Sequence, residues 1–180
     1  LGPEMKSTGE VMGIARDFPA AFAKAQAAAG ARLPREGTVF LTVSDTDKQA
    51  AVGIAAQLHD LGFHILATRG TAQAIARFGV SVETLNKIGE GSPHVVDRIE
   101  SGDVDLVINT PTGTAARSDG HEIRRAAVAR GIPCITTISG GLAAARAISA
   151  ARLGEPEVMS LQDVHRERAE PAPVAAETAP

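Results

Sequence analysis

The sequence predicts an α/β domain with an open five-stranded parallel sheet and helices on both faces. Apolar runs of strand length alternate with stretches in which apolar residues recur at helical spacing, and most of these stretches end at a glycine. Hydrophobic residues make up 44% of the 180 residues, which is enough for a substantial core. A repeated strand–helix rhythm is typical of βαβ units, whose strands run parallel and whose helices cover the sheet.

Five apolar runs correspond to the predicted strands, and a helix-like stretch follows each run. The runs occupy residues 39–43, 63–67, 80–85, 106–108 and 132–136. The helical stretches occupy residues 50–61, 71–78, 94–99, 122–129 and 142–153. The glycines that follow these stretches are Gly62, Gly79, Gly102, Gly131 and Gly154. Glycine is favoured just beyond a helix, because it adopts the left-handed conformation without strain.

The two ends of the chain differ from this central region. An alanine-rich helical stretch at 18–29 would bury little by itself, and 170–180 consists mostly of Pro, Ala and Glu. The predicted division is residues 1–30, the end of a neighbouring unit; 31–37, a linker; 38–166, the domain; and 167–180, a disordered tail. Because the chain begins Leu1-Gly2-Pro3 and not with Met, we expect it to be a piece of a longer protein.

The composition argues against several classes of protein. The formal net charge is −3, which argues against a nucleic-acid partner. The sequence has no apolar run of membrane-spanning length and no signal-peptide pattern at its start. Cys134 follows a proline within an apolar run, so we expect a buried strand thiol; a nucleophilic role would need a partner histidine that cannot be identified. These features fit a reducing cytoplasm.

A binding site is expected at the turns that follow the carboxyl ends of the strands, where open parallel sheets bind ligands. These turns, at residues 42–48, 67–71, 86–93, 109–114 and 136–141, are rich in hydroxyl groups and glycine. Unpaired N–H groups at helix starts favour a phosphate. In the second turn, Gly70 would let the backbone come close to a phosphate, and Thr68 and Thr71 would add hydroxyl donors.

Positive charge lies at the same predicted edge, on Lys48, Arg69 and Lys87. Asn109 in the fourth turn has both the donor and the acceptor that a base or sugar contact requires. Each turn taken by itself also has a structural interpretation, because Ser, Thr and Asp commonly cap helices and glycine is common in turns. The turns match neither the P-loop nor the dinucleotide fingerprint. The coincidence of cations and hydroxyls at one edge is what favours phosphate binding.

Signals for catalysis and for metal binding are weak. The carboxylates near strand ends are expected to be helix caps or solvated charges; they are Asp45, Asp47, Glu90 and Asp119. The five histidines are scattered along the sequence and form no metal-ligand pattern. His94 opens a predicted helix near the site, so we expect a local structural role, with ligand contact as the alternative.

Residues of all five turns resemble those of the methylglyoxal-synthase-like family, and in particular the C-terminal allosteric domain of the carbamoyl phosphate synthetase large subunit. The segments that carry the resemblance are Thr42-Val43-Ser44 through Lys48, Ala67-Thr68-Arg69-Gly70-Thr71, Asn86-Lys87, Glu90-Gly91-Ser92-Pro93-His94, Ile108-Asn109-Thr110, Thr136-Thr137 and Gly140-Gly141. Residues 1–13 resemble the end of that subunit's second ATP-using synthetase unit. The resemblance therefore covers about residues 1–165.

The resemblance implies a regulatory role. The whole enzyme makes carbamoyl phosphate for arginine and pyrimidine biosynthesis from bicarbonate, two ATP and ammonia, which a glutamine-hydrolysing small subunit delivers. It would use ATP with Mg or Mn, and K, in the rest of the large subunit. The domain present here would have no catalytic residue, cofactor or metal. It would bind an effector, UMP as inhibitor or IMP as activator. The resemblance leaves open whether the chain forms a homo-oligomer.

The resemblance also implies roles for particular residues. By position, Lys48, Thr68, Thr71, Lys87 and Asn109 match nucleotide-contacting residues of the family. Together with the reasoning on the turns, this predicts a nucleotide site made of Lys48, Thr68, Gly70, Thr71, Lys87, Asn109 and Thr110. Thr136 matches a residue that helps to bind ornithine. Pro111 stands where some relatives have a ligand-contacting Thr and Arg69 where at least one has a His, so the identity of the nucleotide stays open.

Three other functions compete with the regulatory one. Methylglyoxal synthase eliminates phosphate from dihydroxyacetone phosphate with an Asp base just before the helix that here begins near Pro93, but this sequence has Gly91-Ser92-Pro93-His94 there. The IMP cyclohydrolase domain shares a similar first turn, but its Pro-Glu-Met-Leu-Asp-Gly stretch and its His-Pro are absent. A pure oligomerisation module would need no ligand.

In the regulatory hypothesis, a nucleotide phosphate draws Lys48, Lys87 and turn 68–71 together and shifts the packing against the synthetase unit.

Overall fold

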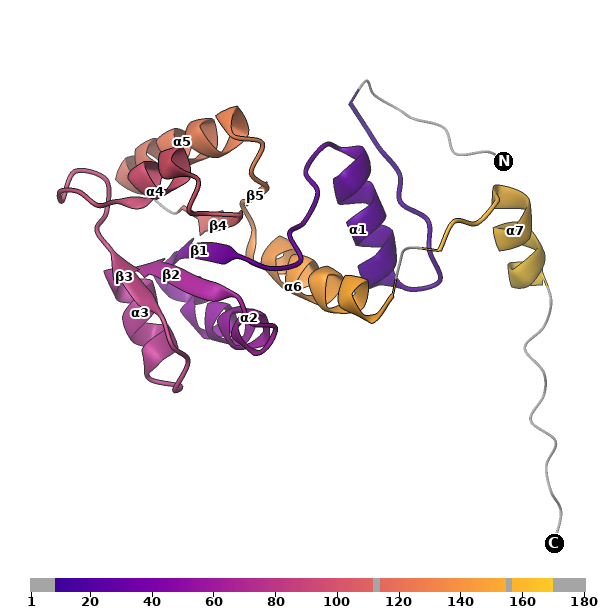
Figure 1. The fold of residues 1–180 in the computed structure, drawn as a ribbon, viewed down its shortest axis with the longest axis horizontal. Helices are drawn as coiled ribbons and strands as arrows, with labels where there is room; N and C mark the ends of the chain where they lie inside the picture. Colours follow the sequence, from indigo (N-terminus) through magenta and orange to yellow (C-terminus); the bar gives the residue numbers. More distant parts are fainter. Residues whose placement is uncertain (1–8, 112–113, 155–156, 170–180) are drawn as a thin grey trace, which may run out of the picture.

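The computed structural model describes residues 9–111, 114–154 and 157–169 of the chain. Of the predicted tail at 167–180, residues 170–180 lie outside these residues, whereas 167–169 belong to a helix. Most of the segment at 1–13 also lies outside them. The described part contains one five-stranded sheet in the order β3-β2-β1-β4-β5, with every neighbouring pair parallel. Figure 1 shows the sheet between two layers of helices. The predicted fold class is therefore confirmed.

The strands follow the apolar runs of the sequence. They are β1 Thr38–Val43, β2 His64–Thr68, β3 Glu83–Leu85, β4 Leu106–Thr110 and β5 Cys134–Ile135. The central strand β1 pairs with both β2 and β4, so that Leu41 lies opposite Ala67 on one side and Ile108 on the other. Strands β3 and β5, at the two edges, are shorter than predicted. Val80 and Val82 precede β3 and pack, half-buried, against the core without joining the sheet.

Helices cover both faces of the sheet, as its βαβ connections require. One face carries α2 Lys48–Asp60, α3 Arg69–Ala76 and α6 Ile138–Leu153, and the other carries α4 Val95–Ser101 and α5 Thr114–Ala129 (Figure 1). The predicted helical stretches all fall within or overlap these helices. Helix α5 begins eight positions before the predicted start at 122.

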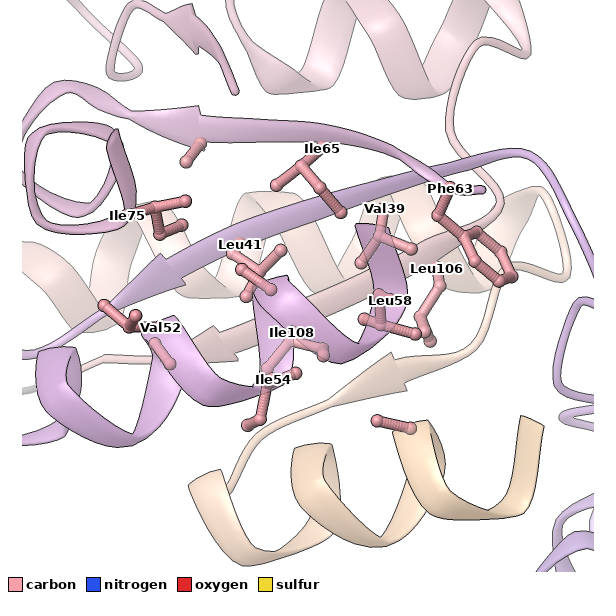
Figure 2. Close-up of a cluster of buried hydrophobic side chains, with 14 of the residues drawn as sticks. Val39, Leu41, Val52, Ile54, Leu58, Phe63, Ile65, Ile75, Leu106 and Ile108 are labelled. Carbon is pink, nitrogen blue, oxygen red and sulfur yellow. The ribbon is translucent and has the colours of Figure 1, made fainter. Parts of the chain in front are cut away.

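Alternate residues of the central strands supply the two halves of the core, because successive side chains of a strand point to opposite faces. Val39, Leu41 and Ile108 are fully buried toward α2 and α6, where they meet Ile54 and Leu58 (Figure 2). On the other face, buried side chains from β1, β2 and β4 meet α4 and α5; they are Phe40, Leu66, Val107, Val95, Ile99 and Ile123. The sheet is thus rigidly held on both sides.

The N-terminal helix α1, Phe18–Ala28, lies along α6 and away from the sheet (Figure 1). Asp17 caps it by accepting a hydrogen bond from the Ala20 N–H at 2.8 Å. Gly13 fits against the helix backbone, where a Cβ would come 2.7 Å from the nitrogen of Ala25. The predicted helical stretch is therefore present, has no fully buried residue, and packs on the domain through α6.

A last helix, α7 Leu161–Ala169, was not predicted. It is polar, and in Figure 1 it lies beyond α1, at the far end of the molecule from the sheet. Ser160 and Asp163 start it with reciprocal hydrogen bonds: the Ser160 hydroxyl donates to Asp163 at 2.6 Å and accepts from the Asp163 N–H at 3.1 Å. None of the helices in the described ranges is long and apolar enough to cross a bilayer.

Candidate functional site

A cavity of about 630 Å³ opens at the carboxyl edge of the sheet. It lies where the chain leaves β1 toward one side and β4 toward the other, the kind of crevice in which open α/β sheets bind ligands. All of the predicted nucleotide-binding residues line this cavity: Lys48, Thr68, Gly70, Thr71, Lys87, Asn109 and Thr110. Sequence reasoning placed these residues at one edge, and the topology brings their side chains around one space.

The turns after β1 and β4 are fastened to each other by hydroxyl groups. The Thr110 hydroxyl accepts a hydrogen bond from the Ser44 N–H at 3.2 Å and donates to the Asp47 carboxylate at 2.7 Å. The Ser44 hydroxyl donates to the same oxygen of Asp47 at 2.9 Å. Asp47 is therefore a structural acceptor at the junction of the two turns. Although it stands at the N-cap position of α2, its side chain makes no capping hydrogen bond among the described residues.

A second group of hydroxyls joins β1 to β2. The Thr42 and Thr68 hydroxyls lie 3.1 Å apart, and the Thr71 hydroxyl accepts a hydrogen bond from the Val43 N–H at 3.3 Å. Thr68 and Thr71 are 8% and 2% exposed, so both are buried at the floor of the cavity. Buried hydroxyls of this kind can rotate their protons toward a bound oxygen, because each also keeps acceptor capacity.

The start of α3 points its first-turn N–H groups toward this edge. Within the described structure, its N-cap Thr68 makes no side-chain capping hydrogen bond, so the first N–H groups of the helix stay available. A Cβ on Gly70 would lie 3.2 Å from the Lys48 ammonium nitrogen, so the glycine leaves room for Lys48 beside the helix start. A helix N-terminus, an ammonium group and hydroxyl donors therefore converge on one place.

Two lysines supply positive charge to the cavity. The Lys48 ammonium lies 2.6 Å from the Asp45 carboxylate. The hydrogen bond from Lys48 and its charge hold the pKa of Asp45 below the ordinary 3.8; burial opposes this and the charge of Lys87 adds to it. Lys87 is exposed, and its backbone N–H donates to Glu90 at 3.2 Å. Arg69, the third expected cation, is exposed and does not contribute to the lining.

Asn109, at the end of β4, is 3% exposed and faces the cavity. Its amide nitrogen is buried and has no hydrogen-bond partner among the described residues. A Cβ on Gly120 of α5 would approach this nitrogen to 3.1 Å and the Pro111 ring to 3.2 Å. The glycine therefore lets α5 pack closely over the amide.

Helix α5 supplies lining residues that were not predicted as site residues: Asp119, Gly120 and Ile123. The apolar pattern of this helix begins at Ile123, so nothing in the periodicity placed residues 119 and 120 on a helix. The signal that could have found them is their position about one helical turn before the start of that pattern. Residues 112–113 of the fourth turn lie outside the described residues.

Thr136 lies apart from this cavity. It is exposed on the turn between β5 and α6, beside Thr137, which caps α6 by accepting from the Gly140 N–H at 3.1 Å. His94 is the N-cap of α4 and does not line the cavity. Cys134 is half-buried in β5, and burial raises the pKa of its thiol. No group of three potential metal ligands occurs in the described ranges.

Comparisons with known proteins agree with this architecture. A family model described as "MGS-like domain" matches residues 50–136. The chain is 50% identical over 179 residues to the carbamoyl phosphate synthase large chain of Gemmatimonas aurantiaca, covering 99% of this chain and 16% of that protein. It is 53% identical over 167 residues to the carbamoyl phosphate synthase large chain, C-terminal section, of Methanopyrus kandleri, covering 92% and 31%.

Methylglyoxal synthase from Elizabethkingia anophelis shares the fold with a TM-score of 0.50 and 19% identity, over 77% of this chain and 95% of that one. At this identity the likeness concerns the fold alone. The chain spans less than a third of either curated relative, 16% of one and 31% of the other. The chain therefore contains an MGS-like domain and belongs, by similarity along nearly its whole length, with the C-terminal section of the carbamoyl phosphate synthase large chain.

Proposed function

We propose that this chain is the effector-binding regulatory region of a glutamine-dependent carbamoyl phosphate synthase large chain, and that its cavity binds a nucleotide monophosphate such as UMP or IMP. One observation carries the proposal: the uncapped start of α3, Lys48, Lys87 and the buried hydroxyls of Thr68 and Thr71 meet in one cavity. Its volume of about 630 Å³ lies within the range typical of small-molecule sites.

The phosphate would lie at the start of α3. There the N–H groups of the first turn and the hydroxyls of Thr68 and Thr71 would donate hydrogen bonds to it. Lys48 would add full charge beside Gly70, and Lys87 would approach from the opposite turn. Such charge-assisted hydrogen bonds are about twice as strong as neutral ones, so the phosphate would contribute most of the affinity.

The rest of the nucleotide would extend toward β4 and α5. The Asn109 amide, buried and without a partner among the described residues, would donate to an oxygen or nitrogen acceptor of the ligand. Pro111, Gly120 and Ile123 would form the neighbouring wall. A site that contains a buried donor discriminates against ligands without a matching acceptor, because such ligands leave the donor unpaired.

In the intact enzyme the domain would act by allostery and would not itself be catalytic. A nucleotide that binds one conformation better than another shifts the population toward that conformation. The whole protein would use ATP with Mg or Mn, and K, work with a glutaminase small subunit in the cytoplasm, and make carbamoyl phosphate for arginine and pyrimidine biosynthesis. The exposed Thr136 would contribute to a separate ornithine site.

The proposal is tested by calorimetric titration of the chain with UMP and with IMP. Saturable binding of either nucleotide is expected. Lys87→Ala should weaken it about tenfold or more, because a charge-assisted contact is lost. The matched control is Arg77→Ala, which removes one positive charge at the far end of α3 and should bind like the unsubstituted chain.

Two outcomes would contradict the proposal. If neither nucleotide binds, or if Lys87→Ala binds as tightly as the control, the cavity is not the nucleotide site. Formation of methylglyoxal from dihydroxyacetone phosphate by the same chain would instead support the phosphate-lyase alternative. That reaction needs a carboxylate base, and among the carboxylates of the cavity Asp45 is paired with Lys48.

A further inference from the structure

The loop between β3 and α4, residues 86–94, delivers Lys87 to the cavity. Its first three residues, Asn86, Lys87 and Ile88, line the cavity, whereas residues 89–94 do not. Lys87 itself is exposed, so no packed surroundings fix its side chain. The place that its ammonium group can reach is therefore set by the backbone of the loop.

Contacts within the loop hold its entry. Asn86 forms an isolated parallel bridge with His94, which ties the residue before Lys87 to the last residue of the loop. The Glu90 N–H donates to the Lys87 carbonyl at 3.0 Å, and Ile88 packs against the buried cluster around Phe40. The first and last residues of the loop are thus joined to each other at its base. An interaction that holds His94 in place therefore also holds Asn86 in place.

Asp97 of α4 fixes that base. One of its carboxylate oxygens accepts hydrogen bonds from the His94 N–H at 2.9 Å and from the Ser92 hydroxyl at 2.7 Å. In return, the Asp97 N–H donates to the His94 ring nitrogen Nδ1 at 3.4 Å, completing a reciprocal cap of the helix. The neighbouring side chains Val95 and Ile99 are 1% and 0% exposed, so α4 is anchored to the sheet.

We infer that Asp97 is a positioning residue for the nucleotide site: through His94 and Asn86 it holds Lys87 at the cavity, although it lines no part of the cavity itself. This inference rests on the proposed function, because it assigns a role in nucleotide binding. The path consists of two contacts described above and one covalent bond. Asp97 accepts from His94, His94 bridges to Asn86, and a peptide bond joins Asn86 to Lys87.

Two substitutions separate the hydrogen bonds of Asp97 from its charge. Both bonds end on the same oxygen, so Asp97→Asn can keep them with its amide oxygen, whereas Asp97→Ala loses both. We expect Asp97→Ala to weaken UMP or IMP binding roughly threefold to tenfold and Asp97→Asn to stay within about twofold of the unsubstituted chain. The matched control is Asp17→Ala, which removes the cap of α1 and should leave nucleotide affinity unchanged.

The double variant Asp97→Ala/Lys87→Ala tests whether the effect passes through Lys87. If it does, the double variant should bind like Lys87→Ala alone, because the positioned group is already gone. If the two factors multiply, Asp97 acts on another part of the site and the inference is overturned. It is also overturned if Asp97→Ala binds as tightly as the unsubstituted chain, or if Asp17→Ala weakens binding equally.

A ligand-free measurement keeps this inference separate from the proposed function. If neither nucleotide binds the unsubstituted chain, the proposed function fails, and amide hydrogen exchange decides whether Asp97 holds the loop. Exchange in segment 86–90 should be fastest in Asp97→Ala, clearly slower in Asp97→Asn and unchanged in Asp17→Ala. Equal exchange in all four proteins would show that Asp97 does not position the loop.

Discussion

Among single residues, Asp45 has an unusual place, because it brings a negative charge to the cavity, as Asp119 does, and also pairs with a lysine of the cavity. Its carboxylate lies 2.6 Å from the Lys48 ammonium, and its side chain is 94% exposed. Pairs that are so exposed contribute little free energy, because water and salt screen them. A phosphate at the start of α3 would therefore compete with Asp45 for Lys48 at little cost, while still being repelled by it.

Asp45→Asn should accordingly bind UMP or IMP roughly twofold to fivefold more tightly than the unsubstituted chain, since repulsion of the phosphate is removed. The gain should shrink as salt rises from low to physiological concentration. Titration at two ionic strengths measures both effects, with Asp60→Asn at the end of α2 as the charge-matched control. Weaker binding by Asp45→Asn would mean instead that Asp45 orients Lys48 for the ligand.

Gly120 is the second residue whose identity matters for the cavity. Gly120→Ala should weaken nucleotide binding about threefold or more, because its Cβ would press on the Asn109 amide and on Pro111. The melting temperature should change little, since alanine is the better helix former. Gly53→Ala on α2 is the matched control, because a Cβ there meets nothing within 4 Å. Unchanged affinity in Gly120→Ala would show that Asn109 does not contact the nucleotide.

At the scale of elements, the cap of α4 makes stability depend on pH. Hydrogen bonds from the His94 N–H and then the Ser92 hydroxyl lower the pKa of Asp97 below its ordinary 3.8, while burial opposes this and the electrostatic effect of the His94 side chain adds to it. A carboxyl with a lowered pKa in the folded chain stabilises it above the ordinary value. This stabilisation is lost as the pH falls through the lower, folded-state value.

The stability difference between the unsubstituted chain and Asp97→Asn should therefore be largest at neutral pH, begin to shrink as the pH falls below about 4, and disappear below the lower, folded-state pKa of Asp97. Both proteins share every other titrating group, so the difference reports on Asp97 together with its contact to the His94 ring, 3.4 Å away. Thermal unfolding of the two proteins at neutral pH and near pH 3 provides the measurement. A difference that stays constant across this range would contradict the assignment of the lowered pKa to the folded-state cap.

Elements also show where sequence periodicity stops being informative. The strands and α2, α3 and α6 follow clear apolar patterns, and the structure confirms them. The first turns of α5 carry no apolar repeat, so periodicity does not predict them. Gly120 in this part of the helix lies close to Asn109 and Pro111 at the end of β4. Helix α7 has a different cause: its start is marked by the Ser160–Asp163 pair, a capping pattern that a search for apolar periodicity passes over.

For the whole molecule, the sequence was sufficient to predict a common edge for the site but not the contacts across it. Those contacts depend on strand order, which places β4 beside β1 and so brings Thr110 to Ser44 and Asp47. Composition and turn chemistry contain no information on strand order. The same topology explains why Thr136, which follows the edge strand β5, is outside the cavity. Arg69 lies between the lining residues Thr68 and Gly70, and its own side chain is exposed outside the cavity.

Helix α6 touches both the N-terminal helix and the sheet, and this has a mechanical consequence. On one side it packs along α1, and on the other Gly141 is so close to the sheet that a Cβ would lie 3.2 Å from Ile108, the residue before Asn109. With no side chain at Gly141 to yield, α6 has little freedom to deform locally against the strand. If α1 were displaced, α6 would therefore move with it as a rigid body. The N-terminal part of α6 contacts Ile108, one residue before the cavity residue Asn109.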